Sequence, residues 1–166
     1  MPRAYIGYGS NLGRRRATIE RALLLVHALP ATSVLAQSRY YRTDPWAMAP
    51  GTPAFLNGCA EIETTLSPEV LLHHLHQIER RLGRFALRGP HGEYLSRTID
   101  LDILLYEGCV QPGGTPALPH PEIAARRFVL EPLCELAPAL MHPVLNKTVR
   151  ELLEECPDPG RVWSVG

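Results

Sequence analysis

The sequence predicts an α+β fold in which helices pack on one face of an antiparallel β-sheet. Two observations indicate this class: the predicted elements follow the order βαββαβ, and short helical segments form the C-terminal end. The length of 166 residues suits one domain with a buried core. We therefore expect a single domain over residues 1–166.

The N-terminal half contains three predicted strands and one helix. Residues 4–10 read as a short strand that ends in turn formers, and residues 18–29 carry a helical apolar stripe that stops at a proline. Residues 33–42 and 55–64 contain the β-branched and aromatic residues typical of strands. Between them, residues 43–53 hold three prolines and a glycine, which predicts a long loop.

The C-terminal half begins with a well-marked helix. Residues 67–69 supply a serine N-cap, a proline in the first helical position and an acid in the first turn, and the helix should end at Gly83. A second long loop follows over residues 83–96, and residues 98–106 form the strongest strand. Short helical segments are expected at residues 123–126, 131–136 and 148–155. This order of elements is that of ferredoxin-like folds.

The chain carries no net charge, because 17 Lys and Arg residues balance 17 Asp and Glu residues. This balance excludes a strongly basic nucleic-acid binder, and no apolar run reaches the roughly 20 residues that span a bilayer. The four cysteines form no C-x-x-C pair and no signal peptide is visible, so we expect reduced thiols in a cytoplasmic protein. Because no feature requires a dimer, we expect a monomer.

Two aspartates alternate with apolar residues in the strand predicted over residues 98–106. Asp100 and Asp102 should share one face of this strand, while the other face carries Ile99, Leu101, Ile103 and Leu105. Two like charges on one face repel each other. Mg²⁺ relieves this repulsion, because it binds one or two carboxylates together with waters and substrate phosphates. The alternative for a bare D-x-D pair is a solvated strand face.

Arginines flank the aspartate strand in the sequence. The candidate phosphate ligands are Arg84, Arg88, Arg97, Arg126 and Arg127. Arginine suits this role because its planar guanidinium binds phosphate through two hydrogen bonds. For any one of them the alternative is a solvated surface residue.

Aromatic and amide side chains suited to a flat heterocycle also occur. Phe55 and Asn57 should share one strand face, and the amide of Asn57 offers both donors and an acceptor to the edge of a ring. The aromatic candidates elsewhere are Trp46, Tyr94 and Phe128. A simple core role is the alternative for Phe55 and Phe128.

Two further patterns are weaker. Gly7, Gly9 and Gly13 resemble a dinucleotide-binding fingerprint, but the last spacing is one residue too long. The histidines at positions 73, 74 and 76 and the acid Glu79 lack the spacing of a metal site. A polar helix face is the better interpretation of this second group.

Five blocks of the sequence occur in the order of a known family: residues 5–13, 41–43, 55–57, 97–102 and 119–130. Through these blocks the chain resembles the 6-hydroxymethyl-7,8-dihydropterin pyrophosphokinases of folate biosynthesis, over nearly its whole length. The resemblance implies transfer of pyrophosphate from ATP to the hydroxymethyl oxygen of the pterin, with release of AMP. It also implies that Asp100 and Asp102 hold two Mg²⁺ ions.

The resemblance assigns the remaining roles residue by residue. The pterin would contact Thr43, Phe55, Asn57, Tyr94 and Phe128. ATP would contact His76, Arg84, Arg97, His120 and Arg126. Of these, Arg84 and Arg97 would neutralise phosphate charge from a loop and would count as catalytic together with Asp100 and Asp102.

Two alternatives remain open. One is a non-catalytic ferredoxin-like module that binds a nucleotide or RNA, which the zero net charge disfavours. The other is a degenerate homologue that binds pterin without turnover, because residues 93–96 depart from the pattern of the family. Detection of AMP separates the second alternative from the enzyme.

Overall fold

A computed structural model of the chain describes residues 1–10, 15–43, 54–83 and 99–165. Within these residues, six strands form one antiparallel sheet: β1 (Arg3–Ser10), β2 (Thr32–Gln37), β3 (Tyr40–Thr43), β4 (Phe55–Thr64), β5 (Asp100–Tyr106) and β6 (Val162–Val165). The strand order is β5-β1-β4-β3-β6, and β2 also pairs with β4. Both central strands, β1 and β4, are therefore flanked on each side.

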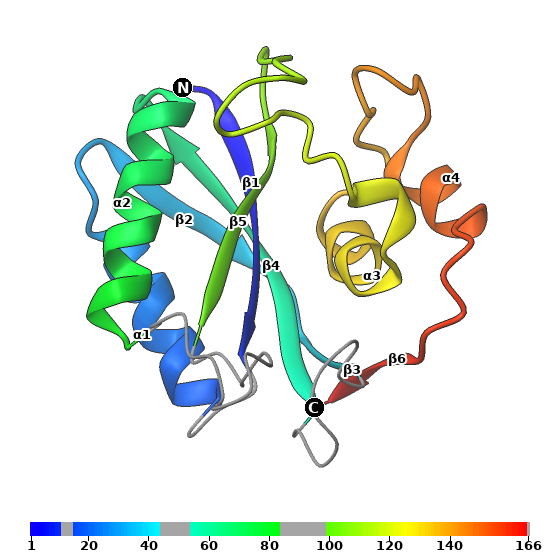
Figure 1. Ribbon diagram of the computed structural model, residues 1–166, viewed down its shortest axis with the longest axis horizontal. Helices are drawn as coiled ribbons and strands as arrows, with labels where there is room; N and C mark the ends of the chain where they lie inside the picture. The colour runs from blue at the N-terminus through cyan, green and yellow to red at the C-terminus, as the bar shows by residue number, and fades with distance from the viewer. Residues whose placement is uncertain (11–14, 44–53, 84–98, 166) are drawn as a thin grey trace, which may run out of the picture.

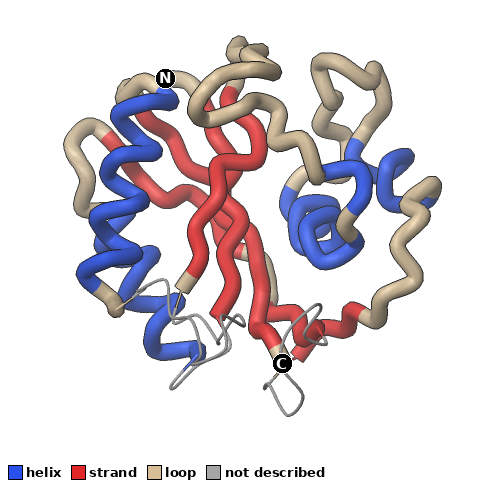
Figure 2. Tube along the Cα trace, in the orientation of Figure 1, coloured by secondary structure: helices blue, strands red, loops and turns tan. Residues whose placement is uncertain are grey.

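Helices cover both faces of this sheet. They are α1 (Arg15–His27), α2 (Pro68–Arg81), the short 3-10 helix η1 (Ile123–Ala125), α3 (Arg127–Leu136) and α4 (Val149–Glu154). In Figure 1, α1 and α2 lie on one side of the sheet and α3 and α4 lie on the other. The colouring by secondary structure in Figure 2 shows the same two-sided cover.

The prediction of helices on one face was incomplete, because the C-terminal helices cover the second face. Consecutive residues of β1 are buried, so both of its faces need apolar cover. One core cluster contains buried residues of α1 and α2, such as Ile19 and Leu75. A second cluster contains Leu130 and Leu133 of α3 with Cys59 of β4.

The strand predicted over residues 33–42 is two strands. It breaks at Ser38, whose backbone N–H donates to the carbonyl of Cys59 and whose Oγ accepts from the N–H of Cys59. These two hydrogen bonds separate β2 from β3 along the same partner strand. The four-residue β6 was not predicted at all, because it follows a stretch rich in proline and glycine.

The apolar face predicted for β5 is wrong at one residue. Ile99, Leu101 and Ile103 belong to the α1–α2 core, but Leu105 belongs to the α3–α4 core. The register between β1 and β5 shifts between Tyr5 and Ile6, which leaves one extra residue in β5. Such a β-bulge reverses the alternation of side chains beyond it. Asp100 and Asp102 precede the bulge and keep the face opposite to Leu101.

The helix start predicted at residues 67–69 is confirmed. Ser67 caps α2 by accepting the backbone N–H of Val70, and Gly83 follows the helix with a φ of 91°. Of the loops predicted over residues 43–53 and 83–96, only Thr43, in β3, and Gly83 lie within the described residues. In the described part of the chain, no helix is both long and apolar enough to cross a membrane.

Because His142 is buried, we expect the protein to lose stability at acidic pH. Its Nδ1 accepts the backbone N–H groups of Val144 and Leu145, at 3.2 and 3.0 Å, and burial lowers the pKa of His142. The unfolded chain therefore takes up this proton first as the pH falls below about 6.5, and the free energy of unfolding decreases.

Asparagine at this position keeps a side-chain acceptor but does not titrate. Between about pH 7.5 and about pH 5.5, we expect the free energy of unfolding of the wild type to fall more steeply than that of His142→Asn. The extra slope should not exceed about 1.4 kcal/mol per pH unit, the value for one proton. Urea denaturation at several pH values measures both slopes, and equal slopes would contradict the role of His142.

Candidate functional site

The candidate site is built on the face of the sheet that α3 covers. Gly9 of β1 lies directly opposite Asp100 of β5 on one side and Asn57 of β4 on the other. Directly opposite residues in an antiparallel sheet share a face, and neighbouring strands are roughly 4.8 Å apart. Asp100, Gly9 and Asn57 thus form a row across three strands.

Gly9 makes room for the side chain of Asn57. A Cβ at position 9 would lie 2.6 Å from Oδ1 of Asn57, a distance that carbon and oxygen atoms do not tolerate. The amide of Asn57 therefore extends over the backbone of β1, between β4 and the aspartate strand. Gly7 lies one step along the same face, opposite Asp102.

The other end of the Asn57 amide is held by β3. Its Nδ2 donates to Oγ1 of Thr43 at 2.7 Å, and both residues are only 6% exposed. Phe55 pairs directly with Thr43, so it lies on the same face and is half-buried. The predicted pterin residues Thr43, Phe55 and Asn57 are therefore neighbours on one surface.

Asp100 and Asp102 also lie on this face and are half-exposed, while Leu101 between them is buried. The glycines opposite both aspartates add no side chain to the space above β1. Two half-exposed carboxylates on one strand face suit a hard cation such as Mg²⁺, which completes its shell with water and phosphate oxygens. The described residues contain no group of three or more metal-ligating side chains. This donor set therefore fits magnesium bound jointly with a phosphorylated substrate better than a closed protein site.

His120 lies within electrostatic reach of Asp100. Burial, and next the positive charge of Arg126, lower the pKa of His120, while Asp100 and Glu122 oppose this shift. Its Nδ1 accepts the backbone N–H of Glu122 at 3.1 Å, so the neutral ring carries its proton on Nε2. His120 is thus a neutral hydrogen-bond donor at neutral pH.

Arg126 and Phe128 extend the site from η1 to the start of α3. The guanidinium of Arg126 lies 5.8 Å from the centre of the Phe128 ring, in a cation–π contact. Its ion pair with Glu122 is long, at 3.9 Å, and both side chains are more than 40% exposed. Such a pair contributes little and leaves Arg126 available for a stronger anion.

Glu79 was predicted to belong to a polar helix face but is buried beside the aspartate strand. It is 2% exposed, and its Oε2 accepts the backbone N–H of Leu101 at 2.8 Å. Since β5 is an edge strand, this bond occupies an N–H group between the two aspartates. Its place four residues after the buried Leu75 was the available signal. His76 lies one turn earlier on α2 and is exposed.

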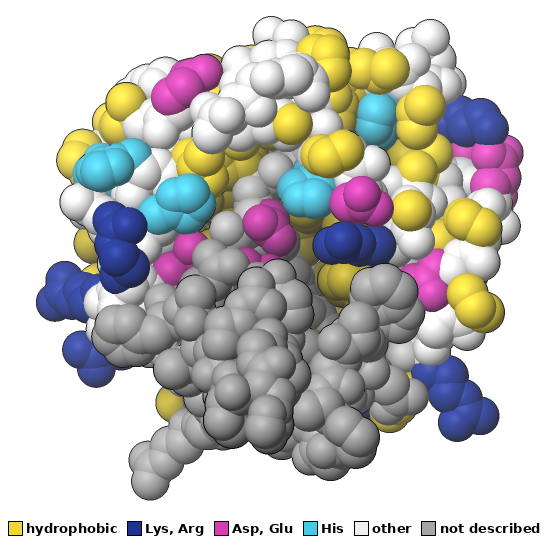
Figure 3. All heavy atoms as spheres, in the orientation of Figure 1, with side chains coloured by type: hydrophobic (Ala, Val, Ile, Leu, Met, Phe, Trp, Pro, Cys, Tyr) yellow, Lys and Arg dark blue, Asp and Glu magenta, His cyan; other side chains and the backbone are white. Residues whose placement is uncertain are grey.

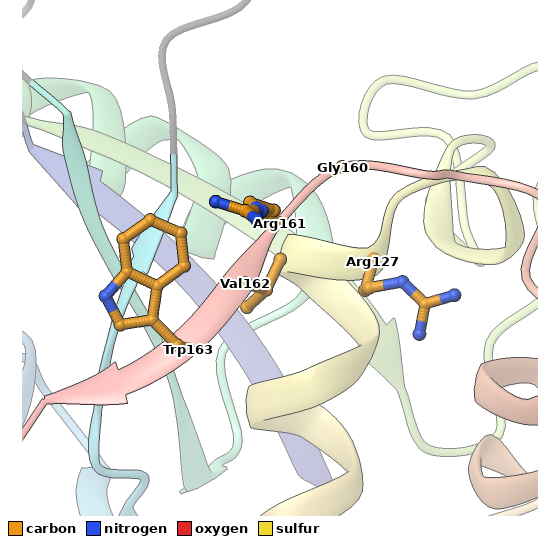
Figure 4. Close-up of a pocket in the computed structure, with 5 residues that line it drawn as sticks. All are labelled: Arg127, Gly160, Arg161, Val162 and Trp163. Carbon is orange, nitrogen blue, oxygen red and sulfur yellow. The ribbon is translucent and has the colours of Figure 1, made fainter.

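A separate pocket of about 370 Å³ lies between α3 and β6, lined by Arg127, Gly160, Arg161, Val162 and Trp163. In Figure 4 the Trp163 indole and the Arg127 guanidinium lie at opposite ends of this group. The guanidinium of Arg127 donates to the carbonyls of Cys156 and Asp158, so Arg127 attaches the C-terminal segment to α3. This arrangement indicates a structural role for Arg127, which was one of the candidate phosphate ligands in the sequence.

The structure brings together seven of the predicted site residues: Thr43, Phe55, Asn57, Asp100, Asp102, His120 and Arg126, with Phe128 beside the last. The predictions for Trp46, Arg84, Arg88, Tyr94 and Arg97 lie outside the described residues. Acidic and histidine side chains gather around a hollow on this side of the molecule, with Lys or Arg beside them (Figure 3). Carboxylates, an arginine and a neutral imidazole next to aromatic and amide side chains suit a reaction between a phosphate ester and a heterocycle.

Comparison with known proteins agrees with this chemistry. The family described as 7,8-dihydro-6-hydroxymethylpterin-pyrophosphokinase matches residues 5–138. A 2-amino-4-hydroxy-6-hydroxymethyldihydropteridine pyrophosphokinase of Methylorubrum extorquens is 40% identical over 99% of this chain and 99% of its own length. The protein of the same name from Pseudomonas aeruginosa is 41% identical, over 95% of this chain and 94% of its own length.

Longer proteins match as well. The folic acid synthesis protein fol1 of Schizosaccharomyces pombe is 40% identical over 97% of this chain, which spans 21% of fol1. The HPPK-DHPS crystal structure of Plasmodium falciparum superposes with a TM-score of 0.70 at 15% identity, over 93% of this chain and 45% of that chain. This likeness supports the ferredoxin-like fold, and the chain spans less than half of the solved protein.

Substitution of Gly9 tests whether this glycine makes room for the Asn57 amide. In Gly9→Ala the new Cβ displaces the Asn57 amide and breaks its hydrogen bond to Thr43, which should lower the free energy of unfolding by about 1–3 kcal/mol. Gly7→Ala is the matched control, because its Cβ would lie 3.2 Å from methyl groups of Leu104 that can shift. We expect it to change stability by less than about 1 kcal/mol in urea denaturation. Equal losses in the two variants would argue against the crowding of Asn57.

Proposed function

Because the chain belongs to the 7,8-dihydro-6-hydroxymethylpterin-pyrophosphokinase family, we propose that it transfers pyrophosphate from ATP to 6-hydroxymethyl-7,8-dihydropterin in folate biosynthesis. The hydroxymethyl oxygen attacks the β-phosphorus of ATP, and AMP leaves. The observation that carries the proposal is the row Asp100–Gly9–Asn57, which sets a carboxylate suited to a phosphate-bound metal ion near an amide suited to the edge of a ring. The family membership disfavours the non-catalytic nucleotide- or RNA-binding module.

The pterin would occupy the surface between β3, β4 and the start of α3. Asn57 would hydrogen-bond the edge of the ring, with Thr43 holding the amide in position. Phe55 and Phe128 would stack on the two faces of the ring, since one belongs to the sheet and the other to the helix that covers it. Tyr94 remains a proposed pterin contact on the basis of the family resemblance.

Asp100 and Asp102 would hold magnesium, and we propose two ions. When bound, magnesium would neutralise charge on the ATP phosphates and orient them for transfer. The two carboxylates are prepared for this role because they share a face and have only backbone opposite them in β1. Glu79 would keep the strand between them in place through the N–H of Leu101.

ATP would lie on the side of Asp100 away from Asn57. His120 would donate its Nε2 proton to a phosphate oxygen or ribose hydroxyl, and Arg126 would exchange its weak pair with Glu122 for phosphate. His76 on α2 is a proposed ATP contact from the resemblance. Arg84 and Arg97 are proposed to supply the remaining positive charge against the roughly four negative charges of ATP.

We also propose the domain organisation, location, oligomeric state and lack of nucleic-acid binding that accompany this function. We propose that residues 1–166 form one domain, that it acts as a cytoplasmic monomer, and that it does not bind nucleic acid. The zero net charge supports the last point, and the four free cysteine thiols support a reducing compartment.

Substitution of either aspartate tests the metal role. In Asp100→Asn and Asp102→Asn, AMP formation should fall at least about 100-fold, because the charge that holds magnesium is halved. The free energy of unfolding should stay the same or rise slightly, since repulsion between the pair is removed. Glu107→Gln, an exposed acid just after the same strand, is the control and should keep full activity.

³¹P NMR of a mixture with ATP, magnesium and the hydroxymethylpterin measures this outcome. Formation of AMP and a pterin diphosphate supports the proposal, whereas ADP would contradict it. Pterin binding without any AMP would instead identify a degenerate homologue. Unchanged turnover in both asparagine variants would refute the metal role while leaving the reaction itself intact.

A further inference from the structure

The carboxylate of Glu135, in the last turn of α3, uses both of its oxygens to bind strand β3 and the residue just before it. Oε1 accepts the hydroxyl of Tyr41 at 2.5 Å and Nε of Arg39 at 3.3 Å, and Oε2 accepts the backbone N–H of Arg39 at 2.9 Å. We call Tyr41, Glu135 and Arg39 the α3–β3 clamp. It joins the helix that carries Phe128 to the strand that carries Thr43.

The charge of the clamp is well stabilised. Burial alone would raise the pKa of Glu135, but the hydrogen bonds from Tyr41 and Arg39 outweigh it and hold this pKa below its ordinary value. Burial and the same carboxylate raise the pKa of Tyr41 to about 12. At neutral pH the clamp is therefore a charged carboxylate bound by neutral and positive donors.

Apolar packing also holds α3 on the sheet. Leu130 and Leu133 pack against residues such as Cys59 and Leu104, and apolar contacts of this kind are not directional. The helix has no side-chain cap at Arg126 and contains Pro132, which cannot donate a backbone hydrogen bond. The clamp is therefore a directional link that can set how α3 lies along β3 and β4.

The clamp is close to the proposed pterin surface at both of its ends. Tyr41 lies directly opposite Asn57 in the sheet and two residues before Thr43. Phe128 lies seven residues before Glu135, on the same face of α3 and roughly 10 Å away along the helix axis. A shift of α3 at the clamp would change the gap between Phe128 and the Phe55–Asn57 surface.

We propose that Glu135, through Tyr41 and Arg39, is a positioning residue that sets the width of the pterin slot. The inference rests on the proposed function, because it assumes that the ring lies between Phe55 and Phe128. It predicts a selective effect: loss of the clamp weakens pterin binding and leaves ATP binding unchanged. A residue that merely stabilised the fold would affect both ligands or neither.

The chain contains a matched control for this chemistry. Tyr5 and Arg3 donate to Oε1 of Glu61 at 2.9 and 3.1 Å, which repeats the combination of tyrosine, glutamate and arginine on the same face of the sheet. This second group joins β1 to β4 and includes no residue of α3. Tyr5→Phe and Glu61→Gln therefore remove similar bonds without releasing the helix.

The test compares Tyr41→Phe and Glu135→Gln with these two controls. Dissociation constants for the pterin and for ATP with magnesium are measured by calorimetric titration, and unfolding midpoints are recorded for every variant. We expect the clamp variants to raise the dissociation constant of the pterin about 10-fold and to change that of ATP less than about twofold. The control variants should change both constants less than about twofold, even where their midpoints fall.

Two outcomes would overturn the inference. The first is an effect of the clamp variants on pterin binding that is no larger than that of the control variants. The second is an equal weakening of pterin and ATP. Phe128→Ala separates this inference from the proposed function. If the wild type binds no pterin, the proposed function is wrong. If Phe128→Ala binds pterin more weakly than the wild type but the clamp variants do not, only the proposal for the clamp is wrong.

Discussion

The absence of a side chain at Gly9 is the constraint on which the rest of the site depends. A single Cβ there would meet Oδ1 of Asn57 at 2.6 Å, so only glycine lets the amide extend across β1 toward the aspartate strand. Gly7 lies opposite Asp102 on the same face, where the side chain of Leu104 approaches its backbone. On this face β1 thus presents two glycines, with Asn57 of β4 on one side and the aspartates of β5 on the other.

Residues of several other elements hold the groups on either side of β1 in position. Thr43 and Glu79 each hold one component through a hydrogen bond, at the Asn57 amide and at the Leu101 backbone. His120 and Arg126 approach from the C-terminal third of the chain, which covers the face that the first two helices leave open. The chain carries no net charge, but its opposite charges are separated locally within this one candidate site.

Helix-capping and strand-alternation rules predicted the structure correctly where the interactions that determine it lie within a few residues of each other in the sequence. The N-cap at Ser67 follows from contacts within one helical turn, and the shared face of Asp100 and Asp102 follows from the alternation of a strand. They failed at Leu105, where a β-bulge reverses the alternation, and at Glu79, whose partner is a backbone group 22 residues away. A bulge leaves no periodic signal in the sequence, and the spacing of Glu79 from Leu75 indicates burial of Glu79 but not its distant partner.

The sequence by itself determined the order of the elements up to β5, apart from the division of β2 from β3, together with the paired aspartates and, through its ordered blocks, the resemblance to the pyrophosphokinases. Tertiary structure alone decided that Asn57, Gly9 and Asp100 form one row, that α3 covers the second face, and that Glu135 binds Tyr41 and Arg39. The reason is that strand pairing and helix packing bring together residues far apart in the chain. Their partners are selected by sheet order and by the burial of both faces, which no short window of sequence contains.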